Sequence, residues 1–460
     1  MLFLEKDKAV LLGLMTMISD VVMRINNIFN YMQDFELKNE CRVKSSDFTR
    51  NSPLNFVNLI IYFLSKTGLT NTMELIVFFE RIGDIEVTKE AFSQARLKLK
   101  PLIFKKLNKH YLEMVYENKK TLKKFKKHIL LAGDGSKVEL PHHKFLIKIF
   151  GGTKNKFGEI KSCMGNSSMI FDVLNKCIFD FEVDSYKTSE KVLIFRNLAN
   201  LFQMDFLENI PKILIFDRGY RSIEFYHYLM KKEEKFVFRL RLNDYKKEKT
   251  KLRNNDQWIN IEITKNRLNQ IKDKKLKSEL LAVGKLNLRI ITIKLVTGEI
   301  EYLITNLDEK EFKHRDIAEI YNLRWQIEIN FKTLKSLLKI ENISGLTKIA
   351  VEQDLLSQIT VYNMINDGKN TSQNLKNENT ENSPFKKKKE GKINTSIAIG
   401  HFKLKLISIF IENDEKEQEK MISLIVIKLT RHYTNTSTKK YERPENTPPR
   451  KNPTNNRRSF

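Results

Sequence analysis

Two short apolar runs, each followed by an acidic residue, constrain the fold of this chain more than any other feature. Residues 128–132 lead into Gly133-Asp134-Gly135, and residues 211–216 lead into Asp217. Short runs rich in Ile and Leu and bounded by turn-forming residues are typical of buried strands. A single Asp after a strand is usually a turn former or helix cap. Two of them predict a site at the carboxyl edge of one sheet, where ligands bind in α/β folds, with the glycines letting the backbone turn.

The segments that flank these runs alternate between strand-like and helix-like patterns. Between the runs, β-rich stretches at 169–174 and 177–183 predict a hairpin, and residues 189–202 predict a helix. After the second run come a helical stretch at 222–230 and a strand-like stretch at 236–240. The order strand, hairpin, helix, strand, helix, strand predicts an α/β fold around a mixed sheet.

The charge of the chain points to a polyanionic partner. It carries 82 Lys+Arg against 56 Asp+Glu, a formal net charge of +26. Basic side chains that neutralise phosphates release condensed counterions, so an excess of this size favours a nucleic-acid partner over the alternative of a merely basic soluble protein.

The three cysteines, Cys41, Cys163 and Cys177, form no CxxC pair, which predicts a reducing interior. Apolar runs are shorter than the ~20 residues of a spanning helix, so we expect a cytoplasmic protein without a membrane segment.

Changes in composition divide the chain into five expected parts. They are a helical N-terminal DNA-binding or accessory domain at 1–125, the α/β core at 126–240 and 306–366, a β-rich insertion at 241–305, a disordered polar excursion at 367–396, and a C-terminal segment with a basic tail at 397–460. Within the first part, Thr88 is a typical capping residue for a helix that ends near Arg96, Lys98 and Lys100. That basic helix could lie on DNA or present a solvated face.

A third acidic residue lies in the helical stretch 314–340. On one continuous helix, Tyr321, Arg324, Glu328 and Lys335 would fall within about 60° of one another around the axis, beside an apolar stripe. An ordinary stabilising pair, Arg324 with Glu328, is the alternative explanation. An acid beside two cations and a phenol is also what a metal and phosphate site requires, because carboxylates suit Mg²⁺ and cations bind the DNA backbone.

These motifs resemble the signature of DDE transposases, and among them the insertion-sequence-four type. The resemblance rests on Gly133-Asp134-Gly135-Ser136 after one strand, Asp217-Arg218-Gly219-Tyr220 after another, and the pattern Tyr-x2-Arg-x3-Glu-x6-Lys from Tyr321 to Lys335. The long interval between Asp217 and Glu328 matches the β-rich insertion of that group. The resemblance covers roughly residues 54–365.

The resemblance implies a ribonuclease-H-like core in which Asp134, Asp217 and Glu328 are the catalytic residues and bind two Mg²⁺ or Mn²⁺ ions. The three carboxylates should then converge within reach of ions ~4 Å apart. The resemblance and the chemistry of the side chains also suggest a set of DNA-contacting residues, namely Tyr321, Arg324, Lys335, Arg218, Tyr220 and Trp258.

The implied function is a bacterial, nucleoid-associated DNA transposase. It would cut DNA at the terminal inverted repeats of its element, join the ends to target DNA, and act as a homodimer on DNA. Two alternatives remain open at this point: a DNA-binding protein that kept the fold and lost activity, and a stand-alone metal-dependent nuclease.

Overall fold

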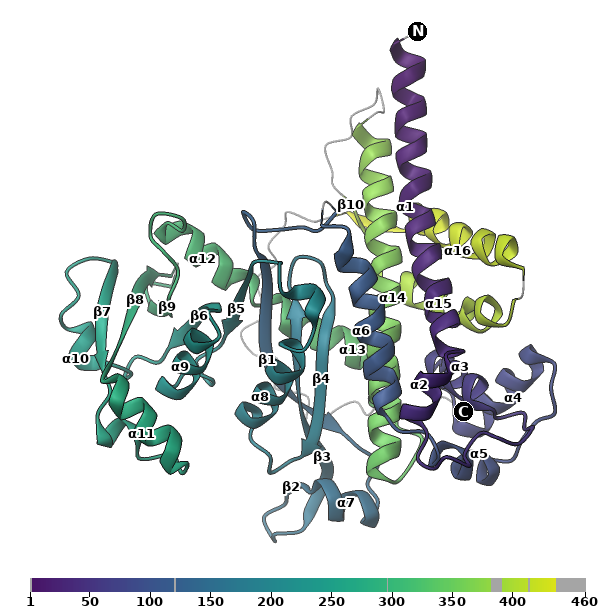
Figure 1. Ribbon diagram of the computed structural model, residues 1–460, viewed down its shortest axis with the longest axis horizontal. Helices are drawn as coiled ribbons and strands as arrows, with labels where there is room; N and C mark the ends of the chain where they lie inside the picture. The colour runs from purple at the N-terminus through teal and green to yellow at the C-terminus, as the bar shows by residue number, and fades with distance from the viewer. Residues whose placement is uncertain (1, 120, 296, 382–390, 413, 436–460) are drawn as a thin grey trace. The chain divides into compact units, whose positions relative to one another are not determined.

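The computed structural model of the chain (Figure 1) describes residues 2–119, 121–295, 297–381, 391–412 and 414–435. The chain divides into two compact units. The first comprises Met1–Asn118, Val138–Gly165 and Lys332–Phe460, and the second comprises Lys119–Lys137 and Asn166–Phe331. This division differs from the expected domains, because the N-terminal helices share a unit with the C-terminal segment.

The strands form a mixed nine-stranded sheet in the order β2-β3-β1-β5-β6-β9-β8-β7, with β4 paired to β3. Their bounds are β1 Ile129–Glu139, β2 Gly152–Lys154, β3 Ile160–Asp172, β4 Ile178–Ser185, β5 Lys212–Phe216, β6 Lys235–Leu240, β7 Asp256–Glu262, β8 Lys285–Lys294 and β9 Ile300–Thr305. The predicted hairpin is β3 and β4, and both predicted buried strands are present as β1 and β5. The predicted mixed α/β fold is therefore confirmed.

The centre of the sheet is parallel and apolar. β1 pairs with β5 from Ile129↔Lys212 to Gly133↔Phe216, and β5 pairs in parallel with β6. The ring of Phe216 stacks on Phe238 with centroids 4.8 Å apart. Because β5 is buried from its second residue onward, this part of the sheet is a rigid support for whatever follows its carboxyl end.

Helices of the second unit connect and cover these strands. Their bounds are α8 Glu190–Leu201, α9 Ile223–Lys231, α10 Lys246–Lys249, α11 Lys274–Val283, α12 His314–Leu323 and α13 Gln326–Ser336, of which the last continues into the first unit. Ser189 and Ser222 cap α8 and α9 with their side chains, as the sequence predicts for helices beginning there. The insertion between β6 and α12 contains β7, β8 and β9.

The first unit is helical. Its helices are α1 Leu2–Met32, α2 Phe35–Cys41, α3 Phe56–Ser65, α4 Asn71–Ile82, α5 Lys89–Arg96, α6 Leu102–Glu117, α7 Lys144–Phe150, α14 Lys348–Glu381, α15 Thr395–Ile411 and α16 Glu415–Leu429. A small antiparallel sheet pairs β10 Gly391–Ile393 with β11 Tyr433–Asn435. Figure 1 shows the long α14 running beside α1 and α6, and it packs against both.

The prediction of a disordered excursion at 367–396 is wrong over residues 367–381, which continue α14. Asp367 is the reason, because it forms an ion pair with Arg24 at 2.7 Å and accepts a hydrogen bond from Tyr111 at 2.7 Å. Polar residues in this stretch thus bind other helices instead of water. Residues 382–390 of the predicted excursion, and most of the predicted basic tail, lie outside the described residues.

The possibility that α5 presents Arg96 to DNA is excluded by its burial. Thr88 caps the helix as predicted, but the Arg96 side chain is only 3% exposed. It lies 3.4 Å from the carboxylate of Asp354 and donates a hydrogen bond to Gln353, both on α14. Arg96 therefore joins two helices of the first unit.

Within the part of the chain that the structure describes, no helix is both long enough and apolar enough to cross a membrane.

Candidate active site

Asp134 lies inside a strand and not at its end, which corrects the sequence prediction. β1 continues to Glu139, but its parallel pairing with β5 stops at Gly133 and Phe216. Asp134 is the next residue of β1, and Asp217 is the first residue after β5. The shared register therefore places the two acidic residues at matching positions, immediately beyond the paired part of the sheet.

The glycines beside Asp134 provide space and not a turn. Gly133 and Gly135 both lie within β1, and neither has a positive φ. A Cβ atom on Gly135 would lie 2.8 Å from Cγ of Glu190 and 3.1 Å from the hydroxyl of Tyr220. A Cβ atom on Gly133 would collide with the ring of Phe216. Glycine is thus required because other side chains come close to the backbone on both sides of Asp134.

The helix expected at 314–340 is broken, which is a second correction. α12 ends at Leu323 and α13 begins at Gln326. The amide N–H groups of Arg324, Trp325, Ile327 and Glu328 donate to carbonyls three residues earlier, at 3.0–3.3 Å. This tightened turn replaces the α-helical pattern, so Tyr321, Arg324, Glu328 and Lys335 do not lie on one continuous helix.

Arg324, in the tightened turn, connects two of the three predicted catalytic acids. Its guanidinium donates a hydrogen bond to Glu328 at 2.8 Å and lies 3.4 Å from Asp134. The side chain is 7% exposed, although burial disfavours its charge. Arg324 therefore offsets the charge of two carboxylates from different elements, and its proposed DNA contact stays a prediction.

Two buried tyrosines hold the first two acids. The hydroxyl of Tyr321 donates to Asp217 at 3.0 Å, and that of Tyr220 lies 3.5 Å from both Asp134 and Glu190. Both rings are at most 7% exposed. Each phenol therefore faces acidic side chains, and the proposed DNA contacts of Tyr321 and Tyr220 stay predictions.

Glu190 is a fourth acid near this cluster that the sequence did not identify. It lies in the first turn of α8, where carboxylates are common because they stabilise the helix dipole. Only its approach to Tyr220 and to Gly135 shows that it faces the site. Its position one residue after the capping Ser189 gave an ordinary structural explanation, so the sequence held no signal for this role.

Burial and nearby negative charge raise the pKa of Asp134 to about 6. Burial is the largest cause, and the carboxylates of Asp217 and Glu190 add to it, while the amide of Gly135 and the guanidinium of Arg324 act in the opposite direction. A carboxylate under these conditions is stabilised by any added positive charge.

The expected direct convergence of three carboxylates on a metal is not present among the described residues, where no three acidic or metal-ligating side chains lie close enough to hold an ion. Arg324 lies between Asp134 and Glu328 instead. The donors nevertheless fit a divalent cation, because two carboxylates already share one cationic partner and oxygen ligands suit Mg²⁺ and Mn²⁺.

Comparison with known proteins identifies the family. A family model described as a transposase DDE domain matches residues 125–364, which is more than half of the chain and contains all three predicted catalytic acids. The chain belongs to the DDE transposase family. The resemblance to DDE transposases found in the sequence is thereby confirmed, and the strands of the mixed sheet lie within the matched range.

Individual relatives of this family match over shorter stretches. The transposase for insertion sequence element IS421 of Escherichia coli and the InsL protein of element IS186A of Escherichia coli K12 are each 37% identical over 67 residues. That stretch is 14% of this chain and spans only 18% of the length of those relatives. A cryo-EM structure of a piggyBac transposase synaptic complex with hairpin DNA aligns with 89% of this chain and 82% of its own, at 11% identity and a TM-score of 0.41.

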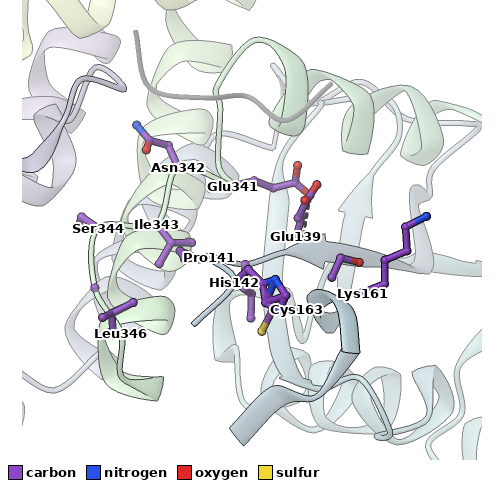
Figure 2. Close-up of a pocket in the computed structure, with 13 residues that line it drawn as sticks. Glu139, Pro141, His142, Lys161, Cys163, Glu341, Asn342, Ile343, Ser344 and Leu346 are labelled. Atoms are coloured by element: carbon purple, nitrogen blue, oxygen red, sulfur yellow. Dashed lines mark hydrogen bonds between the residues drawn. The ribbon is translucent and has the colours of Figure 1, made fainter. Parts of the chain in front are cut away.

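Lys335 belongs to a different environment from the DDE acids. Its ammonium group lies 3.6 Å from Glu341, which lines a pocket of about 530 Å³ in the first unit. Figure 2 shows the side chain of Glu341 meeting Glu139, whose backbone N–H donates to it at 3.0 Å. Burial and the charge of Glu341 raise the pKa of Glu139, and Lys335 lowers it. Lys335 thus counters an acidic pair, and its proposed DNA contact stays a prediction.

The other two predicted DNA contacts lie in the second unit. Arg218 is exposed in the turn that follows Asp217. Trp258 is half-buried on β7, where it pairs with Arg289 of β8. The structure leaves both as predictions. Trp325 is 50% exposed in the tightened turn beside Arg324.

Proposed function

We propose that this DDE transposase family member cleaves DNA at the ends of its own mobile element and joins those ends to target DNA. The observation that carries the proposal is the shared cation: Arg324 contacts both Asp134 and Glu328 within the matched DDE domain, although these acids come from distant parts of the chain. Asp217 follows β5 in register with Asp134. Asp217 would therefore complete one site with the two acids that share Arg324.

In this proposal Asp134, Asp217 and Glu328 hold two Mg²⁺ or Mn²⁺ ions. Bound divalent metal would activate the attacking oxygen and stabilise the leaving oxygen of the phosphodiester. Tyr321 orients Asp217 by donating a hydrogen bond to its carboxylate. Arg324 supplies the positive charge that lets Asp134 and Glu328 lie near one another before metal binds.

The proposed partners are the terminal inverted repeats of the element and a target DNA, and we propose that a homodimer pairs two ends. The net charge of +26 supports a polyanionic partner. We also place the protein with the bacterial nucleoid, because its substrate would be there.

The test is metal-dependent nicking of DNA that carries the sequences flanking this reading frame. We expect nicking with Mn²⁺ or Mg²⁺ that is lost in Asp217→Asn, and calorimetric Mn²⁺ binding that weakens in the same variant. Asp205→Asn is the matched control, because Asp205 is exposed in the same unit. Unchanged nicking by Asp217→Asn would refute the proposed site.

The same assays separate the two alternatives. Cleavage of arbitrary DNA with no joining of ends to a target plasmid would indicate a stand-alone nuclease. Specific binding of the ends, with neither nicking nor Mn²⁺ binding in the wild-type protein, would indicate a DNA-binding protein that has lost its activity.

A further inference from the structure

The segment 142–161, which we call the α7 lobe, carries a surface that the DDE site does not explain. It contains α7, β2 and the turn to β3, and it lies within the first unit (Figure 1). No functional role is predicted for it from the sequence. Its surface combines unpaired lysines with exposed aromatic rings, a combination that few soluble surfaces present without a partner.

The positive charge of the α7 lobe is almost unopposed. All of its lysines are exposed, and they are Lys144, Lys148, Lys154, Lys156 and Lys161. In the described part of the chain, none of these five forms an ion pair with an acidic group. The one acid of the segment, Glu159, already accepts a hydrogen bond from Asn155 at 3.0 Å. The five ammonium groups are therefore available to an external anion.

Large apolar side chains are exposed among these lysines. Phe145 and Ile149 occupy successive turns of α7 and are 55% and 41% exposed, and Phe157 in the β2–β3 turn is 76% exposed. The ammonium of Lys144 lies 5.5 Å from the centre of the Phe145 ring, and that of Lys156 lies 5.0 Å from the Phe157 ring. Each exposed ring is thus accompanied by a cation.

The backbone keeps both elements in place. Leu146 and Phe150 bury the opposite face of α7, and Gly151 ends the helix with a positive φ of 76°. At Gly152 a Cβ atom would overlap the carbonyl of Ser162 on β3, so only glycine permits the β2–β3 pairing. The exposed rings and lysines are therefore presented by a well-packed support.

We propose that the α7 lobe is a DNA-binding surface that favours unpaired strands. Lysines would neutralise successive phosphates, and Phe145 and Phe157 would stack on bases, which have an accessible face only where the duplex is open. A protein partner would need a matching acidic surface, whereas DNA combines phosphates and stacking faces in one ligand. The proposal rests on the proposed action on DNA, but it concerns a surface separate from the DDE acids and needs no cleavage for its test.

The test is fluorescence anisotropy of a short single-stranded oligonucleotide and of its duplex, without divalent metal. The charge variant replaces Lys144, Lys148, Lys154 and Lys156 by Gln. For four phosphate contacts we expect the slope of log affinity against log salt to fall by roughly 3, and single-strand affinity near 0.1 M salt to fall roughly 10²-fold. A matched control replaces four exposed lysines elsewhere in the first unit, Lys89, Lys405, Lys416 and Lys428, and should retain most of the affinity.

The ring variant Phe145→Ala with Phe157→Ala separates stacking from charge. We expect single-strand affinity to fall roughly fivefold or more per ring, with the salt slope and the duplex affinity nearly unchanged. Wild-type affinity in both variants, or an equal loss in the lysine control, would overturn the proposal. Concentration-dependent oligomers that disappear in the ring variant, with DNA affinity unchanged, would instead assign the surface to a second copy of this chain.

Failure of this proposal is distinguishable from failure of the proposed function. If Asp217→Asn abolishes nicking while the α7 lobe variants bind and nick like the wild type, only the lobe is refuted. If no variant nicks but the lobe variants lose single-strand binding, the lobe stands without the enzyme.

Discussion

Lys403 on α15 is a buried cation whose ionisation should control the stability of the helical unit. Its side chain is 6% exposed, and its ammonium donates to the carbonyl of Leu338 at 3.3 Å. Burial lowers the pKa of Lys403 from 10.5 to about 7, Glu74 opposes this, and Lys66 and Lys339 lower it further. We predict that Lys403→Met stabilises the protein at neutral pH and below.

The magnitude follows from the difference between 10.5 and about 7, at about 1.4 kcal/mol for each pH unit. Between these values the unfolded chain holds a proton on Lys403 that the folded chain has released, so the free energy of unfolding rises with pH. Below pH 7 both states are charged, and the folded state carries the full penalty of about 5 kcal/mol. Methionine removes that penalty. The carbonyl of Leu338 then loses the hydrogen bond that Lys403 donates, at a cost of about 1 kcal/mol. A net stabilisation of about 4 kcal/mol is expected below pH 7.

The assay is urea unfolding followed by far-UV circular dichroism at a series of pH values. The stability difference between Lys403→Met and the wild type should shrink by about 1.4 kcal/mol for each pH unit above 7. Lys405→Met, an exposed site on the same helix, should show no such slope. Parallel stability curves for Lys403→Met and the wild type would mean that Lys403 stays charged in the folded protein, and the reasoning from burial would be refuted.

Three further substitutions test other contacts. Gly135→Ala should abolish nicking and cost about 1–3 kcal/mol of stability, because its Cβ would overlap Glu190 and Tyr220; thermal melting and the nicking assay measure both effects. Glu190→Gln should move the acidic limit of Mn²⁺ binding to lower pH, because it removes a charge that raises the pKa of Asp134; an unchanged calorimetric profile would contradict this. Arg96→Met should destabilise the protein by about 3–5 kcal/mol by leaving Asp354 with one fewer cation, yet leave DNA affinity of the folded fraction unchanged.

The buried parts of β1 and β5 were predictable because each consists of consecutive apolar residues. β5 is apolar along most of its length and β1 over its first five residues, so both were found. The rest of β1 is only partly buried and mixes polar with apolar residues, and nothing in that composition distinguishes a strand from a loop. The extension that places Asp134 inside β1 depends on neighbouring strands distant in sequence, which composition does not reveal.

The break between α12 and α13 left no sequence signal for a similar reason. Proline and glycine are the usual marks of a helix break, and neither occurs from His314 to Ser336. A tightened turn shifts the helical phase only slightly, so the apolar stripe continues across it. Ile320 and Ile327 are both fully buried although they lie on different helices. Periodicity therefore identified the buried face correctly while concealing the break.

Charge balance explains why Arg324 faces acidic side chains in this structure, including a contact with Asp134 that motif spacing does not predict. From motif spacing alone, Arg324 is one more basic residue that could bind a phosphate. The spacing carries no information about which carboxylates lie near its guanidinium in the folded protein. In the structure Asp134 and Glu328 both contact that guanidinium, and burial makes an unpaired carboxylate there costly. An anionic cluster built without metal needs an internal cation, so the basic residue nearest the acids in the motif is the one most strongly expected to face inward. The same reasoning leaves the unpaired lysines of the α7 lobe, whose segment holds only one acid, as the basic residues that face outward to DNA.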